Sequence, residues 1–128
     1  MRRGLFFFVL FSALAFYGWD QGVTEGGIGR YIEGRPPFYQ GDRILYVIGS
    51  FHEIMNQDQK ALGMYQRIVT LYPKSRFGDD AQYGVAACYE RLNNRRKALE
   101  EYQKYLEKYP QGRFHISVSR NITLLRGL

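Results

Sequence analysis

The sequence predicts an all-α solenoid of helix-turn-helix units, about two repeats plus a terminal helix, behind an N-terminal signal or signal-anchor segment. The first observation is a repeat, because residues 60–73 and 97–110 share the motifs Lys-Ala-Leu, Tyr-Gln and Tyr-Pro at positions 37 apart. The second is that apolar residues recur with a helical period from residue 42 onward. The third is the composition, 45% hydrophobic and 16% aromatic, which is typical of a folded domain.

Residues 1–20 are predicted to be an export signal or a transmembrane signal anchor. A basic leader precedes an apolar run over residues 5–19, in which Ala13-Leu14-Ala15 fits the small-x-small pattern of a cleavage site. Tyr17 and Trp19 favour retention instead, since aromatic residues of this kind gather at membrane interfaces. As a helix the run would extend about 22 Å, short of the ~30 Å hydrocarbon core. A buried helix of a soluble protein is the third interpretation.

Cleaved or retained, the segment predicts that the rest of the chain lies across the inner membrane. Arg2 and Arg3 precede the apolar run and Asp20 follows it, which is the charge order of a translocated C-terminal part. We therefore expect a protein that is anchored in the inner membrane through residues 5–19 and faces the periplasm, or a periplasmic one after cleavage.

Residues 21–41 are predicted to be an extended linker or arm. They contain six glycines and Pro36-Pro37, residues that each lower helix stability. The arm also carries Tyr31 and Phe38, which are too apolar for an idle spacer. We expect part of it to lie against a helix face or a partner.

Residues 42–128 are predicted to form the helical repeat domain. Proline and paired polar residues divide the apolar pattern into five helices, expected over residues 42–55, 58–72, 79–92, 95–109 and 114–126. Asp42 and Asp58 are the expected N-caps of the first two helices, and Asp79 or Asp80 is expected to begin the third. The fifth helix corresponds to the first helix of a third unit.

Small and aromatic residues recur at matching positions of the two units. They are Gly49, His52, Ala61, Tyr65 and Pro73 in the first unit, and Ala86, Tyr89, Ala98, Tyr102 and Pro110 in the second. This pattern resembles the tetratricopeptide repeat, although the period of 37 exceeds the usual length of about 34 residues. The extra residues lie in the segments 72–77 and 109–114, whose Tyr-Pro connection is similar to that of bacterial envelope proteins. These are the lipoprotein of the outer-membrane β-barrel assembly machinery and the Tol-Pal coordinator.

The small residues of this pattern can be explained by helix packing. Gly49, Ala61, Ala86 and Ala98 fall where paired helices should cross, so that the backbones can approach closely and larger side chains can interdigitate.

The resemblance implies that the first helix of each pair lines a groove that binds partner polypeptides. The positions that would face it are Arg43, Tyr46, Ser50, Glu53, Asp80, Tyr83, Ala87, Glu90, Ser117 and Arg120. A groove with two tyrosines in register and mixed charge suits an extended or helical peptide. The alternative is that Tyr46 and Tyr83 are partly core residues with solvated hydroxyls.

The sequence offers no pattern typical of an enzyme or of a cofactor site. The two histidines, His52 and His115, are far apart in sequence, and His52 occupies the aromatic packing position of the repeat. Cys88, the only cysteine, is expected to be a small buried residue. No metal-ligand spacing occurs, so we expect no metal, no cofactor and no catalytic residues.

The positive charge does not indicate nucleic-acid binding. The chain carries a net charge of +6, and from residue 42 onward 14 Lys and Arg stand against 9 Asp and Glu. The basic residues are spread along the helices rather than clustered with stacking aromatics. We expect a solvated surface and no nucleic-acid partner.

Three functional hypotheses follow. The leading one is a non-catalytic protein-protein interaction module outside the cytoplasm, as a small membrane-anchored subunit or scaffold of a larger envelope or membrane complex. The second is a structural protein that self-associates through the open ends of the solenoid. The third is a binder of anionic surfaces or polymers through the basic repeat domain.

Overall fold

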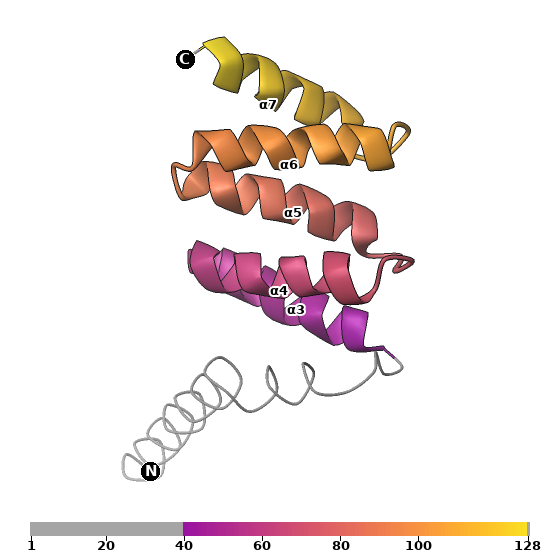
Figure 1. Cartoon of the computed structure of the whole chain (residues 1–128). Coiled ribbons are helices and arrows are strands. Elements are labelled where there is room, and N and C mark those ends of the chain that lie inside the picture. Colours follow the sequence, from indigo (N-terminus) through magenta and orange to yellow (C-terminus); the bar gives the residue numbers. More distant parts are fainter. Residues whose placement is uncertain (1–39, 128) are drawn as a thin grey trace, which may run out of the picture. The chain divides into compact units, whose positions relative to one another are not determined.

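The computed structural model describes residues 40–127, and all regular structure in this range is helical. The predictions for residues 1–20, and for the linker up to Tyr39, lie outside the described residues. The helices are α3 (Gly41–Ile54), α4 (Asp58–Leu71), α5 (Gly78–Arg91), α6 (Arg95–Lys108) and α7 (His115–Gly127), stacked in chain order (Figure 1). The predicted repeat of helix pairs is thereby confirmed for this part of the chain.

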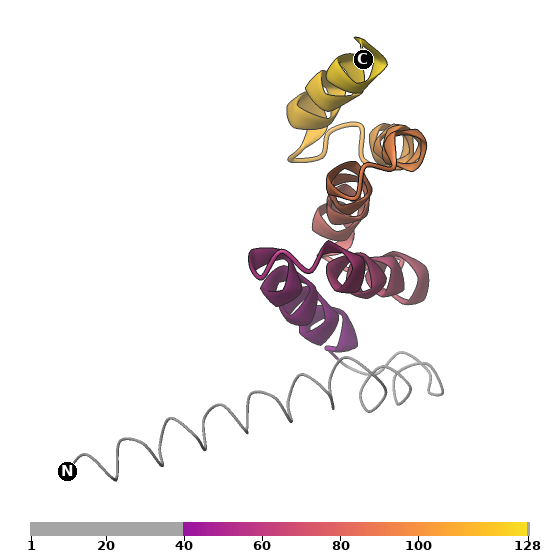
Figure 2. The ribbon, with the colours of Figure 1, turned by 90° about the vertical axis from the view of Figure 1, so that its left-hand side faces the viewer.

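Each helix packs on the next one along the chain, α3 on α4, α4 on α5, α5 on α6 and α6 on α7. The view in Figure 2 shows that α3, α5 and α7, the first helices of the units, lie on one side of the stack, and that α4 and α6 lie on the other. No helix among residues 40–127 is long and apolar enough to cross a membrane.

The predicted N-caps of the first two helices, Asp42 and Asp58, are wrong, because the N-cap residues are Gln40 and Gln57. α3 begins at Gly41 and α4 at Asp58 itself, and neither helix has a side-chain cap. α5 begins at Gly78, one residue before Asp79, so both acids lie within its first turn. The acids still stabilise these helices, because a carboxylate within the first turn interacts favourably with the helix dipole.

Asparagines make the turns between paired helices, as the sequence indicates. Asn56 and Asn93 take positive φ angles of 55° and 57°, a left-handed conformation that asparagine tolerates better than most residues. Asn94 has a second role, since its side chain accepts a hydrogen bond from the Lys97 backbone nitrogen and caps α6.

A buried tyrosine lies at the centre of the first unit. Tyr65 of α4 is 2% exposed, and a Cβ atom built on Gly49 of α3 would lie 2.9 Å from its Cε1 atom. Ala61, Ala86 and Ala98 are fully buried. Small residues therefore occupy the positions predicted for the helix crossings. Gly84 of α5, which the sequence pattern did not single out, meets the other edge of the Tyr65 ring.

The two ends of the stack differ in polarity. On α3, Ile44 and Val47 are 39% and 59% exposed, whereas the corresponding residues of α5, Ala81 and Gly84, are buried. α7 buries Val118, Ile122 and Leu125 against the core of the second unit, but its Ile116 and Leu124 are 83% and 61% exposed. At the offset of 37, the buried or partly buried Gln82, Ala86 and Tyr89 of α5 correspond to the polar residues Ser119, Thr123 and Arg126 of α7. The α3 end is still the more apolar one, because among the described residues it exposes five large hydrophobic side chains, namely Ile44, Val47, Phe51, Ile54 and Met55.

Candidate functional site

The ten residues predicted to face a groove come from the three first helices. Arg43 and Arg120 are exposed, and Ala87 is 7% exposed and so buried. The remaining seven, namely Tyr46, Ser50, Glu53, Asp80, Tyr83, Glu90 and Ser117, are partly exposed. Because α3, α5 and α7 share one side of the stack (Figure 2), we call these residues the first-helix face. Their role in binding stays a prediction.

The two tyrosines of the first-helix face pack on the loops that join the repeats. Tyr46 stacks on Phe77 with ring centroids 4.8 Å apart, and Tyr83 stacks on Phe114 at 4.2 Å. Both tyrosine rings are partly buried, and Tyr83 also contacts the buried core of the second unit. Each ring therefore packs a first helix against the loop that leads to the next repeat. Only part of each ring surface remains exposed on the first-helix face.

Two glutamates of the first-helix face hold the buried tyrosines of the second helices. The Tyr65 hydroxyl donates to Glu53 at 2.7 Å, and the Tyr102 hydroxyl donates to Glu90 at 2.6 Å. Burial raises the pKa of both phenols well above its ordinary value, so they stay neutral donors. Arg91 also contacts Glu53, at 3.0 Å. The structure thus assigns these two glutamates a packing role that the sequence did not reveal.

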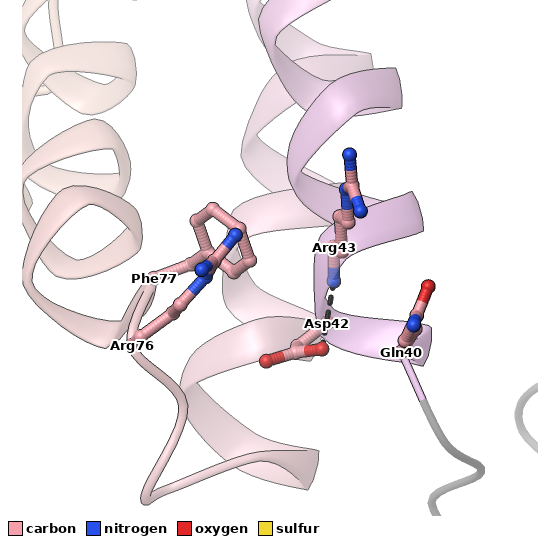
Figure 3. A pocket seen from close by; sticks show the side chains of 5 residues that line it. All are labelled: Gln40, Asp42, Arg43, Arg76 and Phe77. Atoms are coloured by element: carbon pink, nitrogen blue, oxygen red, sulfur yellow. Dashed lines mark hydrogen bonds between the residues drawn. The ribbon is translucent and has the colours of Figure 1, made fainter.

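A cavity of about 420 Å³ opens at the loop between the two repeats. Figure 3 shows it lined by Gln40, Asp42 and Arg43 from the start of α3 and by Arg76 and Phe77 from the loop before α5. Asp42 is committed to local structure. One of its oxygens accepts the Arg43 backbone N–H at 2.8 Å, and the other accepts the Ser75 hydroxyl at 2.5 Å.

Among residues 40–127, no acid pairs with the guanidinium group of either arginine of this cavity. The Arg76 guanidinium carbon lies 4.7 Å from the Phe77 ring centroid, a cation–π contact. Neither Arg43 nor Arg76 forms an ion pair with any residue in the range 40–127. Sequence reasoning placed Arg43 on the face and missed Arg76, although the Arg-Phe pair recurs 37 positions later.

The equivalent junction after the second repeat is closed by its own acids. Asp80 forms an ion pair with Arg113, whose guanidinium lies over Phe114. Asp79 accepts hydrogen bonds from the Tyr105 hydroxyl and from the Arg113 backbone nitrogen. Burial, followed by the bond to Asp79, raises the pKa of Tyr105 to about 12. This acidic pair therefore ties the loop to α5.

A second cavity, of about 370 Å³, lies where α4, α5 and α6 meet, and three of its polar residues bond to one another. Gln82 donates to Glu101 at 2.9 Å, and Lys104 pairs with Glu101 at 2.8 Å. The charged groups of this cavity are thus paired with each other, in contrast to the arginines of the cavity beside Arg43.

Cys88 and His52 are held in packing roles. Cys88 is buried, and burial raises its pKa to about 11, so that it remains a thiol. His52 is 2% exposed and bonds through Nδ1 to Gln57 at 2.7 Å, in the packing position expected for it. Within residues 40–127, no group of three or more His, Cys, Asp and Glu side chains is placed to hold a metal.

Comparison with known proteins matches one family model, Tetratricopeptide repeat, over residues 45–75 and 80–112. The two matched segments make up half of the chain, and they coincide with the pairs α3–α4 and α5–α6. No curated protein and no solved structure matches the chain.

Proposed function

This chain belongs to the tetratricopeptide repeat family, a non-catalytic interaction fold, and from this premise we propose that it binds other proteins through the first-helix face. One observation carries the proposal: two helix pairs repeat in a single register, so that their first helices lie together on one side (Figure 2). Side chains of both charges and partly exposed tyrosine rings meet there. Such a surface suits an extended or helical segment of a partner.

The proposed setting is the extracytoplasmic side of a membrane, where the chain serves as a small anchored subunit or scaffold of a larger envelope complex. The support is the basic leader and apolar run of residues 1–20. The Tyr-Pro connections between repeats, similar to those of bacterial envelope proteins, add to it. Cleavage of the leader would give a periplasmic form with the same face.

The test is affinity purification of the full chain from native membranes, with mass spectrometry of the co-purifying proteins and of the chain's own N-terminus. The variant Ser117→Glu with Arg120→Glu changes the face, and Gln59→Glu with Arg96→Glu makes the same charge change on the second helices. We expect the first variant to lose a partner that the second retains. Equal recovery by both, at unchanged helicity, would reject this face as the binding surface.

A second candidate function, self-association, is favoured by the apolar end of the stack. Val47, Ile54 and Met55 of the α3 end are 59%, 78% and 46% exposed. Light scattering of the full chain tests this candidate, with Val47→Asp as the variant. Self-association through α3 predicts a molar mass above that of one chain, and a lower mass for Val47→Asp. A molar mass that the substitution leaves unchanged argues against it.

A further inference from the structure

The two repeat junctions provide an internal comparison, because their residues correspond one to one at the offset of 37. Beside the first cavity stand Gln40, Asp42, Arg43, Arg76 and Phe77, and their counterparts are Phe77, Asp79, Asp80, Arg113 and Phe114. The acid of the first turn, the loop arginine and the loop phenylalanine are kept. One position differs in charge, since it holds Arg43 in the first junction and Asp80 in the second. The net charge of the five residues is therefore +1 in the first junction and −1 in the second.

The geometry that holds the loop arginine is the same in both junctions. Arg76 and Arg113 each lie 4.7 Å from the ring of the following phenylalanine, and that ring stacks on a tyrosine of the preceding first helix. In the second junction, Arg113 also forms an ion pair with the carboxylate of Asp80. In the first junction the matching place belongs to Arg43, another cation.

Asp42 does not take the place of the missing acid, because it forms no ion pair with Arg43 or Arg76 in the described part of the chain. Its two oxygens already accept the Ser75 hydroxyl and the Arg43 backbone N–H. The guanidinium groups of Arg43 and Arg76 thus line an open cavity with planar arrays of donors, the geometry that matches a carboxylate. At about 420 Å³ the cavity has room for an acidic side chain or a chain terminus.

From this comparison we infer that the first junction receives a carboxylate of the protein partner, in the place that Asp80 fills internally in the second junction. The inference rests on the proposed function and names the chemistry of the partner: an acidic peptide segment, through a Glu or Asp side chain or a free C-terminus. The second junction shows that one carboxylate satisfies this Arg-Phe-Tyr arrangement. A phosphate dianion would bring a second negative charge close to Asp42, which disfavours it.

The test uses the full chain and the fluorescein-labelled peptide Gly-Glu-Tyr-Glu-Gly, with Gly-Gln-Tyr-Gln-Gly as the uncharged control, in fluorescence anisotropy titrations. Each peptide is made with a free and with an amidated C-terminus, which separates terminal from side-chain recognition. If side chains are recognised, we expect the Glu peptide to bind at least tenfold more tightly than the Gln peptide with the same terminus. If the C-terminus is recognised, we expect a peptide with a free terminus to bind at least tenfold more tightly than its amidated form. No difference among the four peptides would overturn the inference.

Two substitutions exchange the character of the junctions. Arg43→Asp supplies Arg76 with the acid that Arg113 has, and we expect at least tenfold weaker peptide binding with unchanged circular dichroism. Asp80→Arg opens the second junction, and we expect calorimetric titration to give two sites per chain. Arg96→Asp makes the same charge change at an exposed position away from the cavity and should bind like the parent chain.

Equal affinities of Arg43→Asp and Arg96→Asp would overturn the inference, whatever the outcome for Asp80→Arg. Binding of inorganic phosphate or of phosphatidylglycerol vesicles in place of any peptide would overturn it too, in favour of a phosphate site. If the peptides fail while partner recovery still depends on Ser117 and Arg120, the carboxylate site is wrong and the proposed function stands. If recovery is also independent of these two residues, both are wrong.

Discussion

The packing of Tyr65 between two glycines makes Gly84→Ala the most informative substitution for the fold. A Cβ atom at residue 84 would lie 2.6 Å from Cδ2 and 2.7 Å from Cε2 of the tyrosine ring. The ring cannot withdraw, because its opposite edge already meets Gly49, where a Cβ atom would be 2.9 Å from Cε1. Its hydroxyl is further held at 2.7 Å by Glu53.

The magnitude follows from two opposing effects. Replacing a glycine inside a helix by alanine stabilises the helix by about 1 kcal/mol. Overpacking a tight contact against a fixed ring costs about 1 to 3 kcal/mol. Gly63→Ala is the matched control, because Gly63 lies inside α4 and nothing stands within 4 Å of a Cβ atom there. The propensity gain is common to both variants, so Gly84→Ala should be less stable than Gly63→Ala by about 1 to 3 kcal/mol.

The assay is urea unfolding of the full chain, followed by circular dichroism at 222 nm, for the parent and both variants. We expect Gly63→Ala to unfold at a higher urea concentration than the parent, and Gly84→Ala at a lower concentration than Gly63→Ala. A Gly84→Ala chain as stable as Gly63→Ala would refute the placement of the Tyr65 ring between α3 and α5.

Three further predictions concern single residues. Ala98→Leu overpacks a fully buried position and should cost about 1 to 3 kcal/mol, so an unchanged melting temperature would contradict the helix crossing. Tyr105 has a pKa raised from 10.0 to about 12, so the stability from its neutral phenol is complete below pH 10 and is lost as the pH rises through 12. Urea unfolding at pH 9 to 12 should show a steeper loss for the parent than for Tyr105→Phe, and parallel curves would count against the buried phenol. Arg91→Ala removes the ion pairs with Asp58 at 2.5 Å and with Glu53 at 3.0 Å and should cost about 1 kcal/mol, an effect that shrinks in 1 M NaCl. A loss independent of salt would indicate packing by the arginine stem instead.

The sequence was sufficient for the repeat and the helices because those signals are local. The Tyr-Pro pairs and the asparagine pairs interrupt the helical period where the chain turns, and the offset of 37 identifies the equivalent positions. The helix starts were less certain for a physical reason. Aspartate is favoured both at the N-cap and within the first turn, so Asp42 and Asp58 could not be assigned to one position from sequence.

The site was harder to predict because its contacts join distant residues. Gly84 approaches a ring 19 positions earlier in the chain, and a glycine inside a helix does not by itself reveal such a contact. Arg76 lies in a loop, outside the helical positions from which the face was derived. One signal was available, namely the charge reversal between Arg43 and Asp80, since aligning the two units places these residues at one position.

The most direct test of the proposed binding face is site-specific photocrosslinking in native membranes. A benzophenone amino acid replaces Arg120, exposed on α7, or Gln103, exposed on α6 on the opposite side of the stack. We predict a discrete crosslinked partner from position 120 and none from position 103. A partner captured from position 103 alone would show that binding uses the second helices, and the first-helix face would have to be abandoned.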